Sequence, residues 1–334
     1  MTTREIILQT LRSTDDFVSG ELLSQQCEIY LEAVRKQIQK LQSEGYEIES
    51  QHRVGYRLVN GEDILNKEAI SSGLPYGFLG KKEQIFCYEE IDSTNLEARR
   101  LILQGYGQGT VIVAKHQTAG RGRLGRHWES PAGTGIWFSV ILEPKVDLQR
   151  TSQYSFVIAV AVAQGIRAAT GLPAQVKWPN DILIGGKKVC GILLELVAEM
   201  RQVHQLIIGI GINANQVQQD FPEEMQMKAT SLAMEKGQSV RRTKVLCAVL
   251  QAIEENYDLL EEKGFDVIRE KWMELSCVIG REVQVIHQDK SILNGIAVGL
   301  ANDGALQVKT KQGMELVTVG DVSLRAADGS YFLV

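Results

Sequence analysis

The chain has 334 residues, of which 44% are hydrophobic and 23% charged, and its formal net charge is −5. This composition is that of an ordinary globular protein, and the length allows two or three domains with sizeable cores. A negative net charge excludes a general attraction to nucleic acid or to anionic membranes, so any such contact has to be local.

Targeting and cysteine patterns bear on where the protein works. The N-terminus lacks the basic-then-apolar pattern of a signal peptide, and the longest apolar run, residues 156–163, is much shorter than the ~20 residues of a membrane span. The five cysteines are scattered and lack paired spacing, which indicates reduced thiols. We therefore expect a cytoplasmic protein that does not contact membranes and, lacking a His/Cys/carboxylate cluster, has no dedicated metal site.

The first sixty residues predict three helices followed by a β-hairpin. A helix over residues 20–27 follows the capping residue Ser19, and a helix over 31–43 has an apolar stripe along one face. The hairpin spans residues 46–58. This order is typical of a winged helix-turn-helix domain, whose third helix reads DNA, and the alternative is a small interaction domain without a nucleic-acid role.

A basic face on this domain favours DNA binding. The candidate phosphate contacts lie on the third helix and the hairpin: Arg35, Lys36, Lys40, Arg53 and Arg57. However, the first sixty residues hold seven basic and nine acidic residues, a net charge of −2, so the attraction to DNA is expected to be modest.

The middle of the chain predicts a mixed α/β domain, because strands and helices follow one another without strict β-α-β alternation. It is preceded by residues 63–84, which are rich in glycine and predict a linker. The tetrapeptide Asp92-Ser-Thr-Asn95 is typical of a helix cap, and residues 155–170, apolar nearly all round, predict a buried helix. Other helices are expected over 243–263 and 265–275, strands over 85–88, 110–114, 136–142, 175–177, 182–184, 189–196 and 205–210, and a long surface loop over 215–228.

The stretch from Lys115 to Trp128, KHQTAGRGRLGRHW, concentrates positive charge and backbone freedom. Arg121, Arg123 and Arg126 alternate with glycines, and the stretch contains no acid. Arginine forks two N–H donors onto a phosphate or carboxylate, and glycine lets the backbone bend closely around an anion. We interpret the stretch as a mobile cationic loop that closes over a phosphorylated species; the alternative is a solvated basic loop.

Several familiar sites are excluded by their spacing. Residues 120–125 match G-x-G-x-x-G, but the sequence after them is typical of a loop and not of the helix that a dinucleotide fold needs. The run GGKK at 185–188 is not a P-loop, and the sequence has no kinase or Ser-His-Asp signature. The remaining cations, the arginine loop with Lys177 and Lys188, suit a reaction that develops negative charge on phosphate and carboxylate oxygens, such as adenylation of a carboxylic acid by ATP.

From residue 280 the pattern changes to short strands separated by turns. Strands are expected over 282–287, 291–300, 306–310 and 315–319, with turns at 302–304 and 311–313. This meander predicts a small β-barrel, and it carries no catalytic signature.

Five stretches together resemble the biotin protein ligases. They are the arginine loop, the tetrapeptide at 92–95, KWPND at 177–181, KVCGILLE at 188–195 and GIGIN at 209–213. The whole chain resembles the two-function type that also represses the biotin operon, whereas the lipoate ligases share the fold type without the GRGRLGR and KWPND runs. The resemblance implies an α+β fold with a winged helix-turn-helix domain at 1–62, the linker at 63–84, a ligase domain at 85–278 and a small SH3-like barrel at 279–334.

The resemblance also implies a reaction and its partners. Biotin and ATP form biotinyl-5′-AMP, and a lysine of biotin carboxyl carrier protein then takes the biotinyl group. Mg²⁺ accompanies ATP, operator DNA is a second partner, and the adenylate-bound protein is a homodimer.

The resemblance assigns roles to residues of this chain. The implied catalytic residues are Lys188, Arg121 and Arg123, with Lys188 bridging the biotin carboxylate and the α-phosphate. The implied biotin contacts are Ser93, Thr94, Asn95, Gln117, Arg121, Gly122, Arg123, Lys188 and Gly191. The implied contacts of ATP and the adenylate are Lys177, Asn180, Asp181 and Asn213.

One departure from the family pattern concerns DNA. At the start of the reading helix this chain has Tyr30-Leu31-Glu32, where two-function members usually have Ser-Arg-Thr. A phosphate-binding arginine is missing and an acid is added, which argues against operator binding and leaves the ligase prediction unchanged. Two alternatives therefore stay open: a ligase whose winged helix no longer binds DNA, and a ligand-sensing regulator without catalysis.

Overall fold

The computed structural model describes residues 3–12, 14, 16–43, 46–51, 54–60, 63, 65–74, 77–144, 150–199, 202–287, 290–318 and 322–331. The chain forms two units, Met1–Ile64 and Leu65–Val334. No helix among the described residues is both long and apolar enough to cross a membrane.

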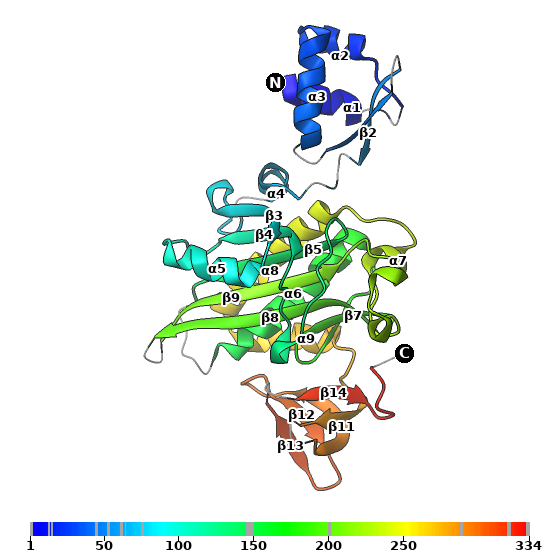
Figure 1. Cartoon of the computed structure of the whole chain (residues 1–334). Coiled ribbons are helices and arrows are strands. Elements are labelled where there is room, and N and C mark those ends of the chain that lie inside the picture. The colour runs from blue at the N-terminus through cyan, green and yellow to red at the C-terminus, as the bar shows by residue number, and fades with distance from the viewer. Residues whose placement is uncertain are drawn as a thin grey trace. The chain divides into compact units, whose positions relative to one another are not determined.

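The N-terminal unit has the predicted order of three helices and a hairpin (Figure 1). Ser19 caps the second helix as expected, because its hydroxyl accepts the Leu22 N–H at 3.1 Å. Val34, Ile38 and Leu41 on the third helix are buried in the unit's own apolar core. The elements are α1 (Thr3–Arg12), α2 (Gly20–Cys27), α3 (Leu31–Ser43), β1 (Glu47–Gln51) and β2 (Gly55–Asn60).

The segment predicted to be a linker is instead part of the second unit. It contains α4 (Lys67–Gly73) and the short 3-10 turn η1 (Lys82–Gln84). Leu65, Ile70 and Leu79 are all at most 2% exposed and belong to the main core. Only a few apolar residues stand among glycines and polar residues here, so the average composition hid side chains that are individually well buried.

A seven-stranded mixed sheet forms the middle of the second unit. Its strands follow the order β3-β4-β5-β9-β8-β7-β6, with β3 and β4 parallel and every other neighbouring pair antiparallel. The predicted α+β class is therefore confirmed. The strands are β3 (Ile85–Ile91), β4 (Val111–Gln117), β5 (Gly135–Leu142), β6 (Gln175–Lys177), β7 (Asp181–Ile184), β8 (Lys187–Glu199) and β9 (Gln202–Asn213).

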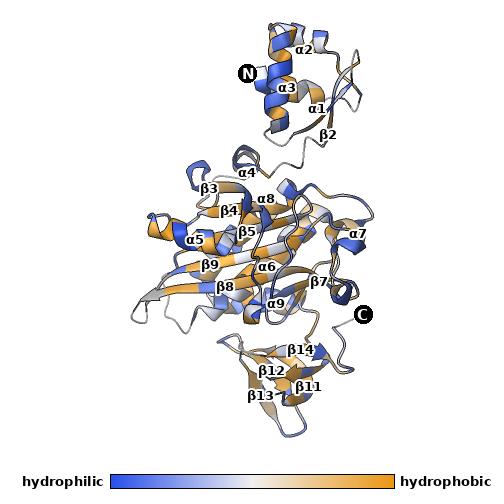
Figure 2. Ribbon diagram, in the orientation of Figure 1, coloured by the Kyte–Doolittle hydropathy of each residue, from blue (hydrophilic) through white to orange (hydrophobic). Residues whose placement is uncertain are grey.

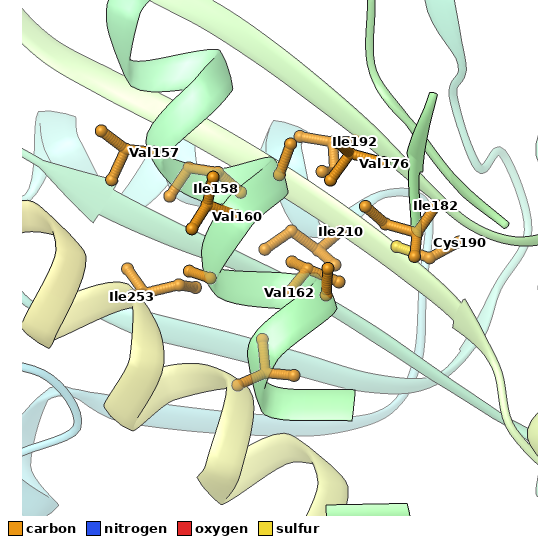
Figure 3. Close-up of a cluster of buried hydrophobic side chains, with 14 of the residues drawn as sticks. Val157, Ile158, Val160, Val162, Val176, Ile182, Cys190, Ile192, Ile210 and Ile253 are labelled. Carbon is orange, nitrogen blue, oxygen red and sulfur yellow. The ribbon is translucent and has the colours of Figure 1, made fainter. Parts of the chain in front are cut away.

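Helices cover the two faces of this sheet unequally. α6 (Ser152–Thr170), α8 (Arg242–Lys263) and α9 (Phe265–Leu275) pack into the main core on one face, where Figure 3 shows valines and isoleucines of α6 against strand residues. The strands and helices of this core are largely hydrophobic in Figure 2, and each such buried side chain stabilises the fold by about 1.5–3 kcal/mol. Only α5 (Thr94–Leu103) packs on the other face, over Ile112, Ile141 and Ile207.

The loop expected over residues 215–228 contains two 3-10 turns, η4 (Gln218–Asp220) and η5 (Glu223–Met225), and α7 (Leu232–Lys236) follows it. Asn213 fastens this region, because its Nδ2 donates to the Thr230 carbonyl at 3.1 Å. These contacts make the loop a fixed wall of the second unit next to the end of β9.

The C-terminal part is β-rich, as predicted. Its antiparallel strands follow the order β13-β12-β11-β10-β14, and the last of them was not predicted. The turn at 302–304 packs on α6, where the Ser152 hydroxyl donates to the Asp303 carbonyl at 2.8 Å. Closure into an SH3-like barrel stays a prediction. The strands are β10 (Glu282–Ile286), β11 (Ile292–Leu300), β12 (Leu306–Lys309), β13 (Met314–Val317) and β14 (Ser323–Ala326).

Candidate active site

Three glycines make a flat floor on the face of the sheet that α5 covers only in part. Gly191 on β8 lies opposite Gly211 on β9, and Gly209 lies two residues along β9. A Cβ atom at Gly211 would clash with the Trp128 indole, and one at Gly209 would clash with the Asn95 amide. The glycines therefore let other side chains, and by the same argument a ligand, lie directly on the sheet.

A buried polar network forms one wall above this floor. The Thr94 N–H donates to Gln117 Oε1 at 2.9 Å, and Gln117 Nε2 donates to the Ser130 hydroxyl at 2.9 Å. Ser139 Oγ on β5 lies 2.7 Å from Thr94 Oγ1 and 2.6 Å from Asn95 Oδ1. These contacts fix the side chains of Thr94, Asn95 and Gln117 before any ligand arrives, because a satisfied buried network is rigid.

The interpretation of Asp92-Ser-Thr-Asn95 as a side-chain helix cap is wrong. Ser93 holds the N-cap position of α5 but makes no side-chain cap bond. Asp92 instead accepts hydrogen bonds from its neighbour's N–H at 2.7 Å and from Arg100, and the bond with Arg100 keeps the pKa of Asp92 below its usual value. Ser93, Thr94 and Asn95 are only 2–3% exposed, and all three line the cavity above the floor.

Two buried N–H groups point to a missing ligand. Within the part of the chain that the structure describes, Asn95 Nδ2 and Trp128 Nε1 are buried and have no hydrogen-bond partner. Buried polar groups are nearly always bonded, and leaving one unpaired costs ~1–3 kcal/mol. Both residues line the same cavity, so an acceptor on a small molecule there would satisfy them.

This first cavity, which we call the floor cavity, is small. Its volume is about 50 Å³, whereas ligand pockets usually have about 300–1,000 Å³. The indole of Trp128 lies over Gly191 and Gly211 and occupies the missing space, so a ligand has to displace it. The described lining residues are Ser93, Thr94, Asn95, Gln117, Arg121, Gly122, Trp128, Asn180, Lys188, Gly191, Ile192, Leu193, Gly209, Ile210 and Gly211.

The arginine loop folds back on itself as a tight hairpin between the cavity and solvent. Arg121 and His127 form an antiparallel bridge, and the Gly122 N–H donates to the Arg126 carbonyl at 2.8 Å. Leu124 at the tip has φ 59° and ψ 32°, a left-handed conformation that is unfavourable for a bulky residue. No dinucleotide-type helix opens at Gly125, as expected. The predicted closure of this loop over a ligand stays a prediction.

A second, cationic cavity of about 360 Å³ adjoins the first. Its basic residues come from the arginine loop, the central sheet and the C-terminal part: Arg123, Arg126, Lys177, Lys188, Lys228 and Arg325. Among the described residues that line it, Asp181 is the single acid. Such a surplus of positive charge suits a polyphosphate.

Asp181 organises the lysines of the cationic cavity. Its Oδ1 lies 2.6 Å from Lys188 Nζ, and its Oδ2 lies 4.0 Å from Lys177 Nζ. Burial by itself would raise the pKa of Asp181, but the two lysines outweigh burial and the pKa is lowered. Burial lowers the pKa of Lys177 to about 8, and Asp181 offsets this only in part.

A β-bulge brings Lys188 onto the floor. Residues three apart on a regular strand face opposite sides of a sheet, so Lys188 and Gly191 should not share a face. The register between β7 and β8 shifts because Ile182 pairs with Cys190 while Leu183 pairs with Lys188. As a result Lys188 Nζ lies 3.2 Å from the position of a Cβ on Gly191 and 5.0 Å from the centre of the Trp128 ring.

Lys188 and Asn180 line both cavities and so mark their junction. Asn180 is held in place because its Oδ1 accepts from Arg123 at 3.1 Å and its Nδ2 donates to the Ile192 carbonyl at 2.7 Å. A carboxylate in the floor cavity and a phosphate in the cationic cavity would therefore meet at the Lys188 ammonium.

Most of the predicted site residues come together, but one does not. Asn213 is not among the described residues that line either cavity, since its amide is bonded to Thr230 instead. The sequence reasoning also gave no role to Trp128, Ser139, Arg325 or Tyr331, which lie in or against the two cavities. A lone serine in the apolar run of β5 was a usable signal for Ser139, whereas nothing local marks Arg325 or Tyr331.

The residues present fit a magnesium ion that travels with a nucleotide. The described residues hold no cluster of three or more metal-ligating side chains, and Asp181 is already bonded to Lys188. Mg²⁺ commonly uses few protein ligands and takes the rest from phosphate and water. Asp181 is the one carboxylate of the cationic cavity that would reach such an ion.

The lowered pKa of Lys177 predicts a pH dependence. An ammonium that contacts phosphate is lost as the pH rises through about 8, so affinity for a non-hydrolysable ATP analogue should fall above that pH, by roughly ten-fold or more if one charge-assisted bond disappears. Calorimetric titration from pH 6.5 to 9.5 measures the change. Lys177→Met should bind weakly with no decline near pH 8; a parallel decline in wild type and variant would show that Lys177 is not the titrating group.

The predicted DNA-binding residues lie on one face of α3 and on the hairpin. Arg35, Lys36 and Lys40 are exposed, and much of α3 is hydrophilic in Figure 2. Arg57 is engaged within the unit, since it pairs with Glu49 at 2.6 Å and lies 4.7 Å from the centre of the Phe17 ring. Arg53 lies outside the described residues.

The start of α3 is unusual for a DNA-reading helix. Tyr30 is 89% exposed and Leu31 45% exposed, and Glu32 beside them is also exposed. The tip of α3 therefore presents apolar and acidic groups, with the cations beginning one turn later.

The fold and the cavities define a class: a winged helix-turn-helix unit joined to a mixed α/β domain that has a small-molecule cavity beside a cationic one. Sequence profiles agree, since that of the Biotin/lipoate A/B protein ligase family matches residues 88–213, the Biotin protein ligase C terminal domain matches 278–325 and an HTH domain matches 3–57.

Relatives that match over most of the chain identify the family. Bifunctional ligase/repressor BirA of Bacillus spizizenii is 38% identical over 96% of this chain and 98% of its own length, and the Escherichia coli protein of that name is 29% identical over 96% and 97%. The structure of a biotin protein ligase from Aquifex aeolicus in complex with biotin and ATP superposes with a TM-score of 0.64 at 35% identity, covering 73% of this chain and all of that one. The chain belongs to the biotin protein ligases of the bifunctional ligase/repressor family.

Proposed function

We propose that the chain is an ATP-dependent biotin–protein ligase that forms biotinyl-5′-AMP and transfers biotin to a lysine of biotin carboxyl carrier protein. One observation carries this proposal: the floor cavity and the cationic cavity meet at Lys188. The complex of the Aquifex aeolicus relative with biotin and ATP supports these two ligands. Neither cavity alone would distinguish a ligase from a small-molecule sensor.

The proposed chemistry follows from the junction. A biotin carboxylate oxygen attacks the α-phosphorus of ATP, the bond to pyrophosphate breaks, and the mixed anhydride remains on the floor. The acceptor lysine amine then attacks the acyl carbon, an amide bond forms and AMP leaves with the bonding electron pair. The ammonium of Lys188 faces the oxygens on which negative charge grows, and Arg121 and Arg123 flank the same point from the loop.

We assign the remaining residues by position. Biotin would lie on Gly191, Gly209 and Gly211, with Asn95 and the Thr94–Gln117 pair bonding its polar ring atoms. The triphosphate and Mg²⁺ would occupy the cationic cavity beside Lys177 and Asp181. Asn213 would act only by fixing the loop that ends at Thr230.

The ligase proposal is tested by transfer of biotin. Purified protein with biotin, ATP and Mg²⁺ should add one biotinyl group to the acceptor domain of a biotin carboxyl carrier protein, and no label should appear when the acceptor lysine is replaced by arginine. Tight biotin binding without labelling would instead identify a ligand-sensing regulator without catalysis.

A second function, repression at a biotin operator, is favoured by the exposed cations of α3 and by the bifunctional relatives. Two half-sites give useful specificity only when two winged helices bind together, so we propose a homodimer that forms when the adenylate is bound. Tyr30-Leu31-Glu32 replaces a cation by apolar and acidic groups, so the operator read by this chain should differ from that of relatives with arginine there.

The operator prediction is a salt dependence. Binding to a palindromic sequence upstream of biotin genes should need biotinyl-AMP, and Lys36→Ala should reduce the slope of log affinity against log salt by about one per protomer. Lys263→Ala on α8, in the other unit, is the matched control and should leave the slope unchanged. If no adenylate-dependent, salt-sensitive binding is found, the protein is a ligase whose winged helix does not read DNA.

A further inference from the structure

The last described residue of the chain reaches into the cationic cavity. Tyr331 follows β14 and lies beyond residues 278–325, the part that matches the C-terminal domain profile. Its hydroxyl donates to Asp181 Oδ2, and its ring centre lies 3.7 Å from Lys177 Nζ and 5.2 Å from Arg325 Cζ. A phenol is thus placed on the carboxylate and between two cations of the cavity.

The arrangement matters because Lys188 has two partners to serve. In the ligand-free structure its ammonium is paired with Asp181 Oδ1 at 2.6 Å. To neutralise charge on a carboxylate and a phosphate, Lys188 has to turn away from Asp181, whose side chain is only 13% exposed. A buried carboxylate that loses its partner is strongly destabilised, so the exchange would be costly if Asp181 had no other donor.

We propose that Tyr331 is a positioning residue for the ligase reaction: its hydroxyl keeps Asp181 hydrogen-bonded while Lys188 moves to the substrates. This inference rests on the proposed function. Lys177, 4.0 Å from the same carboxylate oxygen, gives a second but weaker hold. The phenol is neutral, so it holds the carboxylate without competing with Lys188 for the substrate's negative charge.

A purely structural role would anchor the C-terminal tail without affecting the exchange by Lys188. The two roles differ in which step they change. Anchoring affects stability and the binding of substrates, whereas support for the exchange affects the rate of adenylation at saturating biotin and ATP.

The test compares two Tyr→Phe variants that each remove one phenol–carboxylate hydrogen bond. Tyr331→Phe keeps the ring between Lys177 and Arg325 and removes only the bond to Asp181. Tyr154→Phe is the matched control, since its hydroxyl donates to Glu261 at 2.6 Å and Tyr154 lines neither cavity as the structure describes them. Full-length variants are assayed for the burst of biotinyl-AMP in a single turnover, for biotin affinity and for melting temperature.

Tyr331→Phe should slow the burst by roughly ten-fold or more, as expected when a hydrogen bond to a charged group is lost, and should leave biotin affinity within two-fold of wild type. Tyr154→Phe should leave the burst unchanged. In an Asp181→Asn background the effect of Tyr331→Phe should shrink, because no buried charge remains to support.

A burst in Tyr331→Phe equal to that of wild type overturns the inference, as does a slower burst only in a chain that ends at Ser330, which would assign the effect to the ring. If wild type and Tyr154→Phe form no adenylate either, the proposed function itself fails. The two failures are therefore distinguishable.

Discussion

Replacing Lys188 by alanine is expected to lower the rate of biotinyl-AMP formation by about 10²–10³-fold, the usual cost of removing one preorganised charge from a developing oxyanion. Lys188 is the cation at the junction of the two cavities, and its ammonium is already poised 2.6 Å from Asp181. Biotin affinity should fall much less, because Asn95, Thr94 and the glycine floor remain. The measurement is single-turnover adenylation at saturating biotin and ATP.

Lys187→Ala is the matched control, because this neighbour is not among the described residues that line either cavity. It should keep wild-type adenylation within a few-fold. A Lys188→Ala protein with a normal single-turnover rate and only a higher biotin requirement would contradict the assigned role.

Replacing Arg121 by alanine is expected to release biotinyl-AMP about ten-fold to a hundred-fold faster. Arg121 lines the floor cavity at the base of the loop hairpin, and its guanidinium would lose charge-assisted bonds to the trapped acyl phosphate worth roughly 1.5–3 kcal/mol each. Chasing radiolabelled adenylate with unlabelled biotin and ATP measures the release rate.

His127→Ala is the control for Arg121→Ala. The bridge between Arg121 and His127 is formed by backbone groups, so this variant keeps the hairpin while removing a side chain. Equal release rates in both variants would mean that the loop conformation, and not the Arg121 charge, retains the adenylate.

Much of the fold could be predicted because strong local patterns agree with it. The helix over 155–170 is apolar all round and is buried as α6, and the stripe of Val34, Ile38 and Leu41 lies in the N-terminal core. Short or diluted patterns failed: β14 has only four residues, and α4 with its buried Ile70 stands among glycines and polar residues. In both cases distant packing partners, and not local propensity, stabilise the element.

The candidate site could be predicted only as a set of motifs. Their spacing did not reveal that a bulge between β7 and β8 would place Lys188 over Gly191, nor that Ser139 would bond the side chains of the supposed cap. Tyr331 and Asp181 are 150 residues apart, and only the tertiary fold brings the tail to the cationic cavity. Such contacts depend on register and domain packing, which no short stretch of sequence encodes.

The central claim is that the two cavities cooperate to join biotin to AMP. Exchange of radiolabelled pyrophosphate into ATP reports this step alone, without an acceptor protein or DNA. Wild-type protein should catalyse exchange that depends on biotin, and Lys188→Ala should lose nearly all of it. Absence of exchange with biotin present, or the same exchange without biotin, would contradict the account.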